Sequence, residues 1–209
     1  ALTRYKALLV SPYFVPGDDG VAGLTALVRR RDAFVGVVTN SLAANDVVAV
    51  HGGYANYRKA LLRGGVALYE MRPEAAQPDS SLFGSSGASL HTKAFVIDDR
   101  YGFVGSFNID PRSIDLNTEM GVLFDDPALA VALREEYVRL TGPDRSYWVY
   151  LNPEGELRWL DRAADRLIGE NDDGLLVIHD LDERLAGLHG QFVSVFIVFV
   201  NVSATVQKI

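Results

Sequence analysis

The chemistry of this sequence concentrates between positions 91 and 108, where four polar side chains of complementary kinds occur. His91 offers a nucleophile or a general acid, and Lys93 offers a positive charge. Ser106 and Asn108 offer a hydroxyl and an amide that donate hydrogen bonds. Together these groups suit a phosphate ester, whose oxygens require positive charge and hydrogen-bond donors.

The spacing of these residues predicts a β-hairpin that brings them together. Residues 92–97 are rich in β-forming types, and side chains on a strand alternate between its two faces. His91 and Lys93 are therefore expected to lie on one strand and to point the same way. Residues 98–102 are turn-like and allow the chain to double back.

The returning strand of this hairpin ends in two small residues, Gly105 and Ser106. Small side chains leave space for a ligand to approach the backbone. Asn108 follows on the same returning strand and supplies an amide near the same end. The hairpin is therefore predicted to gather a histidine, a cation and an amide around one position.

With Asp98, these residues form the pattern HxKx4Dx6GSxN, which resembles the HKD motif of the phospholipase D superfamily. The resemblance implies an α/β fold with a mixed β-sheet flanked by helices on both faces. Glu119 lies where the superfamily has a strand with a carboxylate that orients a catalytic histidine through its Nδ1–H. Asp98 is expected to anchor a neighbouring group rather than to touch the substrate.

The resemblance extends to the sequence before the motif. The segments SPYFVP, TNSLAANDVVAVHGGY and YRKALLRGGVALYE are similar to the second half of bacterial cardiolipin synthases. The similarity reaches about residue 162 and then fades. We therefore expect a phospholipase D-like domain at residues 1–162 and a divergent C-terminal extension at residues 163–209.

The superfamily resemblance implies two HKD motifs that face each other, in one chain or across a homodimer. One histidine attacks phosphorus and forms a phosphohistidine, and the opposite histidine protonates the departing alkoxide. Lys93 and its counterpart neutralise the phosphoryl oxygens, so no metal or other cofactor is expected. His179 and His189 have no lysine two residues later, so a second motif has to come from a partner copy or from sequence outside these 209 residues. The role of His91, nucleophile or acid, stays open.

Three further residues are candidates for substrate binding, beside Gly105 and Ser106. Tyr13 lies at the carboxyl end of the apolar run at residues 6–14, where ligands bind in open α/β sheets. His51 precedes a glycine pair, and it either packs or caps locally or contacts the substrate. Arg112 either binds a phosphate or anionic head group or forms a salt bridge with a nearby aspartate, Asp110 or Asp115.

The rest of the chain predicts alternating strands and helices, since apolar runs alternate with apolar residues at helical spacing. A loop at residues 72–89 is expected to drape over the site. The apolar segment at residues 192–200 is too short to span a bilayer. Strands are expected at residues 6–14, 33–39, 66–70 and 118–124, and helices at residues 21–31, 43–50, 54–63 and 126–140.

The composition of the chain narrows the range of candidate substrates. The net charge of −7 argues against a protein that grips the nucleic-acid backbone, and it also argues against simple electrostatic adsorption to anionic lipid. The absence of cysteine excludes disulfides and thiolate metal sites. Four aromatic residues, Tyr13, Phe14, Tyr54 and Trp148, favour a phospholipid as the substrate.

Three functions are compatible with these residues. The first, which the resemblance favours, is transfer of a phosphatidyl group to the alcohol of phosphatidylglycerol, with phosphatidylethanolamine as a second candidate substrate. The second is a homodimeric, single-motif phosphodiesterase that hydrolyses lipid or nucleic acid. The third is a truncated half that only binds lipid or a partner. For the first, we expect a peripheral location at the cytoplasmic face of the inner membrane, or a cytoplasmic one.

Overall fold

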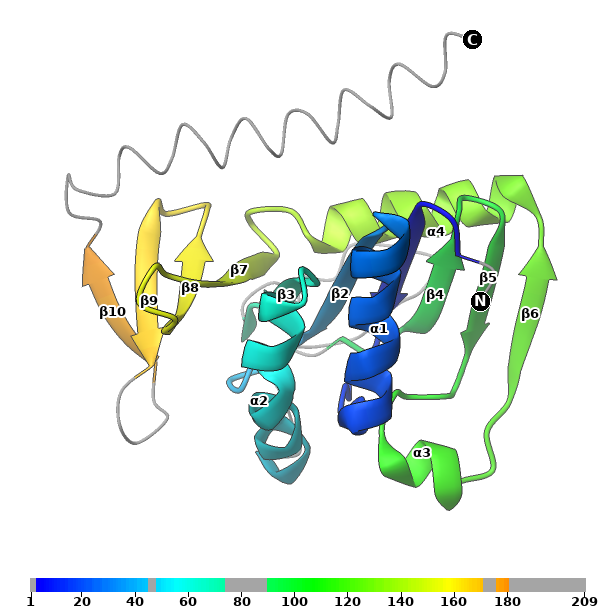
Figure 1. Cartoon of the computed structure of the whole chain (residues 1–209), viewed down its shortest axis with the longest axis horizontal. Coiled ribbons are helices and arrows are strands. Elements are labelled where there is room, and N and C mark those ends of the chain that lie inside the picture. Colours follow the sequence, from blue (N-terminus) through cyan, green and yellow to red (C-terminus); the bar gives the residue numbers. More distant parts are fainter. Residues whose placement is uncertain (1–2, 45–47, 74–89, 171–175, 181–209) are drawn as a thin grey trace, which may run out of the picture.

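The computed structural model describes residues 3–44, 48–73, 90–170 and 176–180. Within these ranges the chain forms one mixed ten-stranded sheet, in the order β10-β9-β8-β7-β3-β2-β1-β4-β5-β6 (Figure 1). The strands are β1 (Lys6–Val10), β2 (Phe34–Asn40), β3 (Ala67–Met71), β4 (Lys93–Ile97), β5 (Tyr101–Gly105), β6 (Gly121–Asp125), β7 (Ser146–Leu151), β8 (Leu157–Asp161), β9 (Arg166–Glu170) and β10 (Leu176–Asp180). The helices are α1 (Gly17–Arg31), α2 (Val48–Arg63), α3 (Pro111–Asp115) and α4 (Pro127–Leu140).

The centre of the sheet is parallel and its flanks are antiparallel. β1 pairs with β2 and β2 with β3 in parallel, whereas β4 joins β1 and β7 joins β3 in antiparallel orientation. Parallel strands are usually covered on both faces, so they consist of nearly continuous apolar runs. The apolar run of β2 is buried over its last six residues, as this rule requires.

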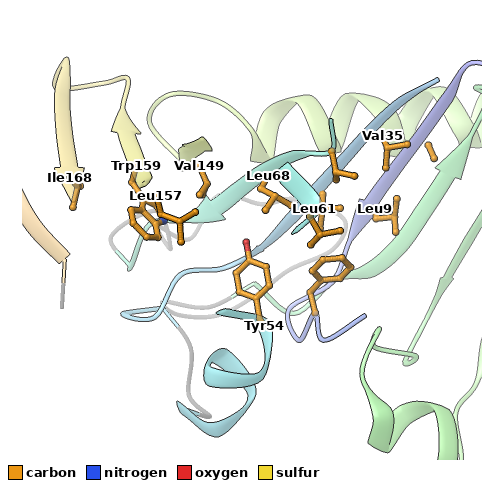
Figure 2. Close-up of a cluster of buried hydrophobic side chains, with 13 residues drawn as sticks. Leu9, Val35, Tyr54, Leu61, Leu68, Val149, Leu157, Trp159 and Ile168 are labelled. Carbon is orange, nitrogen blue, oxygen red and sulfur yellow. The ribbon is translucent and has the colours of Figure 1, made fainter. Parts of the chain in front are cut away.

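Helices cover both faces of the sheet. α1 and α2 lie on one face and α4 crosses the other (Figure 1). The period-two alternation of β1 divides its side chains between two cores, with Ala7 and Leu9 under α1 and α2, and Leu8 and Val10 under α4. Figure 2 shows the first core, in which Tyr54 and Leu61 of α2 lie over the sheet. The predicted sheet with helices on both faces is confirmed.

The start of α4 also follows the sequence prediction. Asp126 has an extended backbone, and its carboxylate accepts hydrogen bonds from the backbone N–H groups of Ala128 and Leu129. Pro127 occupies the first helical turn, where its missing N–H costs nothing.

One helix prediction is wrong, because α2 runs without a break through His51-Gly52-Gly53 instead of starting after it. Two consecutive glycines disfavour a helix by about 1 kcal/mol each. Tertiary packing outweighs this cost, since His51 and Tyr54 are both buried on this turn. A Cβ on Gly53 would lie 3.2 Å from the side chain of Val15, so the second glycine also allows the helix to approach that loop.

Several predicted strands are shorter than their apolar runs. β1 ends at Val10, and Pro12, which has no N–H for a strand ladder, follows two residues later. β6 begins at Gly121 rather than at residue 118, because Ser106 Oγ accepts the N–H of Met120 in place of a strand partner. His91 and Asn108 both lie outside the hairpin strands: His91 precedes β4 and Asn108 follows β5.

The sheet continues past residue 162, where the sequence similarity fades. β9 pairs with β8 and β10 pairs with β9, both antiparallel. Most of the predicted loop at residues 72–89, and all of the apolar segment at residues 192–200, lie outside the described residues. In the described part of the chain, none of the helices combines the length and the apolar character that a bilayer crossing needs.

Candidate active site

The polar residues of the motif lie along one edge of the sheet, by which we mean the line formed by the carboxyl ends of its central strands and not an edge strand. β1, β2 and β3 end at this edge, and β4 begins there because it is antiparallel to β1 and pairs Ala94 with Val10. β5 returns to the same edge, where Gly105 lies opposite Lys93 on one side and opposite Gly121 on the other. The spacing from Lys93 to Gly105 therefore places both motif ends together, as predicted.

Lys93 is the first residue of β4 and is largely buried. Its Nζ donates a 2.8 Å hydrogen bond to the backbone carbonyl of His91. The His91 side chain itself is exposed. Because His91 precedes the strand, the alternation of strand side chains does not fix the direction of its imidazole. His91 and Lys93 are joined instead by the hydrogen bond from Lys93 Nζ to the His91 carbonyl.

Ser106 and Glu119 form a second polar unit at this edge. Ser106 Oγ donates to Glu119 Oε2 at 2.5 Å, and Asn117 Nδ2 donates to Glu119 Oε1 at 3.2 Å. These bonds, that of Ser106 above all, lower the pKa of the Glu119 carboxyl, with smaller contributions from Ser113 and the charge of Lys93. Glu119 lies in the segment before β6 rather than on a strand. Its carboxylate contacts the serine of the motif here, while the predicted contact with an imidazole stays a prediction.

Asn108 is 8 % exposed, and its Oδ1 has no hydrogen-bond partner among the described residues. Its neighbour Ile109 holds it at the edge, since Ile109 N–H donates to Ser11 Oγ at 3.1 Å and its carbonyl accepts from Val15 N–H at 2.6 Å. Ser11 thus ties the turn after β1 to the segment after β5. The sequence prediction missed this role of Ser11, although a small polar residue directly after a buried strand indicated it.

Tyr13 lies in that same turn after β1 and is half-buried. Its carbonyl accepts a 2.7 Å hydrogen bond from Ser11 Oγ. The structure therefore brings the Tyr13 backbone near the segment of Asn108, through a shared serine.

Asp98 lies away from these residues, at the opposite end of β4 from Lys93. Its carboxylate accepts from the backbone N–H groups of Arg4, Tyr5 and Lys6 at 2.7, 3.0 and 2.9 Å. Its φ of 53° begins a tight turn in the left-handed region, which aspartate tolerates better than most residues. Asp98 therefore anchors the start of β1 to the hairpin.

Arg112 is exposed on α3, and its guanidinium forms no ion pair with the described side chains. Asp110, one suggested partner, is instead the N-cap of α3 and accepts from the backbone N–H groups of Arg112 and Ser113. The salt bridge with Asp110 is therefore replaced by a helix cap.

His51 lies inside the core and not at the open edge. Its ring is 5 % exposed, and Nε2 lies 2.5 Å from Nη2 of Arg58. Burial, followed by the charge of Arg58, lowers the pKa of His51 to about 4, so the imidazole is neutral at pH 7. Arg58 forms a buried 2.9 Å ion pair with Glu70, which accepts from Trp159 Nε1 at 2.9 Å. This network favours the packing alternative for His51.

Two of the four aromatic residues expected to favour lipid are core residues. Phe14 is 1 % and Tyr54 is 2 % exposed, and their rings pack edge to face at 5.9 Å. This expectation is wrong for both, because the apolar turn after β1 folds back over α2. Trp148 is half-buried on β7.

The fold resembles that of a solved phospholipase D family member. The crystal structure of NUC from Salmonella typhimurium matches with a TM-score of 0.50 at 19 % identity, over 66 % of this chain and 78 % of that chain. The chain thus has a phospholipase D-type fold. It belongs to the family described as "Cardiolipin synthase, PLD-like domain", whose model matches residues 2–141.

Curated relatives agree with this assignment. Cardiolipin synthase C of Escherichia coli (strain K12) is 45 % identical over 164 residues, which is 77 % of this chain and 34 % of that protein. Cardiolipin synthase A of Pectobacterium carotovorum subsp. carotovorum is 29 % identical over 156 residues, or 69 % of this chain and 28 % of that protein. The chain therefore spans about a third of the length of these relatives.

Proposed function

We propose that this chain is one HKD half of a phospholipase D-type phosphatidyltransferase of the cardiolipin synthase kind. The proposal rests on one observation: the residues of the motif lie together at one sheet edge. They are His91, Lys93, Gly105 and Ser106, with the carboxylate of Glu119 beside the serine. The similarity to cardiolipin synthase C supports a phosphatidyl group as the transferred unit.

The proposed reaction has two displacements at phosphorus. In the first, a neutral histidine forms a P–N bond, and the P–O bond to the departing alcohol breaks. The opposite histidine donates its proton to that alcohol. In the second, the alcohol of phosphatidylglycerol attacks phosphorus, the P–N bond breaks, and the proton returns to the second histidine. His91 acts as nucleophile or acid, and its partner histidine takes the other role.

Lys93 and Asn108 are the groups that we expect to contact the phosphoryl oxygens. Lys93 carries its positive charge at a largely buried position, where water screens it less than at the surface. Asn108 is buried, and its Nδ2 can donate a hydrogen bond to a phosphoryl oxygen, whereas its Oδ1, unpaired among the described residues, can only accept one, as from a substrate hydroxyl. A buried acceptor without a partner is expected to complete its hydrogen bonding when the substrate binds.

A second HKD half is needed for this reaction. An exposed apolar surface beside the site could contact such a half. β6 is one of the two edge strands of the described sheet, and Val122 and Leu123, on its opposite faces, are 65 % and 76 % exposed. We call this strand and the apolar residues around it the α3–β6 surface. Its further members are Ile114, Leu116 and Met120. Adjacent exposed apolar residues of this kind mark an interaction surface, and we infer that it receives the second half.

The test of this function uses the full-length protein with phosphatidylglycerol vesicles, with and without phosphatidylethanolamine, beside a plasmid-nicking assay. Formation of diphosphatidylglycerol that is lost in His91→Asn supports the transferase. Nicking or simple lipid hydrolysis without diphosphatidylglycerol would replace it with a phosphodiesterase. Co-sedimentation with the vesicles checks the proposed peripheral membrane association.

A further inference from the structure

The residue directly before His91 is held by a side chain from another strand. Asn40, the last residue of β2, accepts a 2.9 Å hydrogen bond from Leu90 N–H at its Oδ1. Its Nδ2 donates to the carbonyl of Leu90 at 3.3 Å. The amide therefore contacts both backbone polar groups of Leu90, as a strand partner would.

This contact matters because His91 receives little support from the sheet. β4 begins only at Lys93, and the strand ladder with β1 begins at Ala94. Two side-chain contacts hold the intervening backbone instead. Asn40 holds Leu90 on one side of the histidine, and Lys93 Nζ holds the His91 carbonyl on the other.

Asn40 is itself rigidly placed. It is 1 % exposed and pairs with Met71 in the parallel ladder between β2 and β3. Two buried groups of α2 lie nearby: the ring of His51 contacts the backbone of Asn40, and Nη2 of Arg58 contacts Nε2 of that ring. An amide fixed in this way can transmit its position to the Leu90 backbone.

We propose that Asn40 is a positioning residue that sets the place of His91 through its two-point contact with Leu90. This inference rests on the proposed function for its catalytic consequence, but the contact itself concerns structure alone. A misplacement of about 1 Å at a reacting group can cost roughly 100-fold in rate. Asn40 does not touch the substrate in this proposal, so its loss should lower kcat and leave KM nearly unchanged.

The test compares Asn40→Ala and Asn40→Asp with a matched control, Ser146→Ala, in the full-length protein. Ser146 is also fully buried, and its Oγ donates to the Leu140 carbonyl at 2.7 Å, at the start of β7. Asn40→Ala loses two buried bonds to backbone and Ser146→Ala loses one, so thermal unfolding should shift in both variants and by more in Asn40→Ala. We expect kcat to fall about 100-fold in Asn40→Ala with KM within threefold, and to stay within threefold of wild type in Ser146→Ala.

Asn40→Asp supplies a sharper readout. The ionised carboxylate of this variant can still accept a hydrogen bond from Leu90 N–H, but it has no proton to donate to the Leu90 carbonyl. A protonated carboxyl has an O–H donor and restores both contacts. Burial favours the protonated form at moderately low pH. In wild type, His51, the titratable ring beside Asn40, has a pKa of about 4 and is neutral in this range. The ratio of kcat in Asn40→Asp to kcat in wild type should therefore rise as the pH falls from 8 to 5.

Nuclear magnetic resonance of the His91 imidazole separates this inference from the proposed function. A single His91 ring resonance in wild type and in Ser146→Ala, but a broadened or split one in Asn40→Ala, supports positioning even for a protein that lacks transferase activity. An unchanged His91 resonance in folded Asn40→Ala, or a kcat within threefold of wild type in an active protein, would overturn it.

Discussion

Ser106 Oγ donates a 2.5 Å hydrogen bond to the carboxylate of Glu119, thirteen residues later in the chain. The same oxygen accepts the N–H of Met120 at 2.9 Å, so the serine joins the end of β5 to the segment that enters β6. An ionised carboxylate accepts this bond more strongly than a neutral carboxyl does, and the pKa of Glu119 is lowered for this reason first. A lowered pKa makes the contribution of Glu119 to stability dependent on pH.

Glu119→Gln tests this dependence. Because the folded-state pKa lies below the unfolded one, the stabilisation is fully present above the ordinary glutamate value of about 4.3 and is lost as the pH falls through the lowered folded value. The variant should therefore unfold at lower urea concentration than wild type at pH 7, and the difference should shrink by pH 3. A difference in urea midpoint that is constant between pH 7 and pH 3 would contradict the ionised bond.

Lys93→Met keeps the unbranched shape and most of the length of the side chain but removes its charge and its bond to the His91 carbonyl. We expect kcat for diphosphatidylglycerol formation to fall by at least about 10²–10³-fold, the usual cost of one donor to a developing oxyanion. Arg4→Met, which removes an exposed cation near Asp98, serves as the control and should leave kcat unchanged. A kcat for Lys93→Met near that of wild type would remove the lysine from the proposed phosphate contacts.

Chelation tests the assignment of positive charge to lysine. If Lys93 and its counterpart neutralise the phosphoryl oxygens, activity of the complete enzyme should be unchanged in excess EDTA. Loss of activity on chelation, restored by a divalent ion, would show that a metal takes part.

Asp98→Asn separates anchoring from catalysis. Asp98 accepts from three backbone N–H groups at the start of β1, far along β4 from Lys93. Loss of the charge should lower the free energy of unfolding by about 1–3 kcal/mol, measured by urea titration. The kcat of the folded variant should remain within about threefold of wild type, and a much larger fall would place Asp98 in the reaction.

The α3–β6 surface can be tested without disturbing the core. Leu123→Glu places a charge on a side chain that is 76 % exposed, so the isolated chain should fold with an unchanged urea midpoint. In the full-length protein we expect loss of activity, together with a loss of assembly measured by sedimentation where the second half is a separate chain. Val138→Glu, at a 59 % exposed position on α4, is the matched control. Normal assembly of Leu123→Glu would place the interface elsewhere.

Local sequence was sufficient for the parts of this protein that depend on near neighbours. Turn-forming residues at 98–102 and the small residues Gly105 and Ser106 lie close together in the chain, so the hairpin that aligns Lys93 with Gly105 could be predicted. The motif spacing likewise indicated the family, and Asp126-Pro127 indicated the start of α4.

Contacts between distant segments were decided only by the tertiary structure. The helical turn that contains Gly52 and Gly53 forms because His51 and Tyr54 are buried against groups outside the helix, Asn40 and Phe14, and local helix propensity does not include that packing energy. The contact of Asn40 with Leu90, the residue directly before His91 and fifty residues later in the chain, likewise joins distant segments. Side-chain hydrogen bonds to backbone carry no periodic signature in sequence, since a single residue makes them and any fold can bring its partner near.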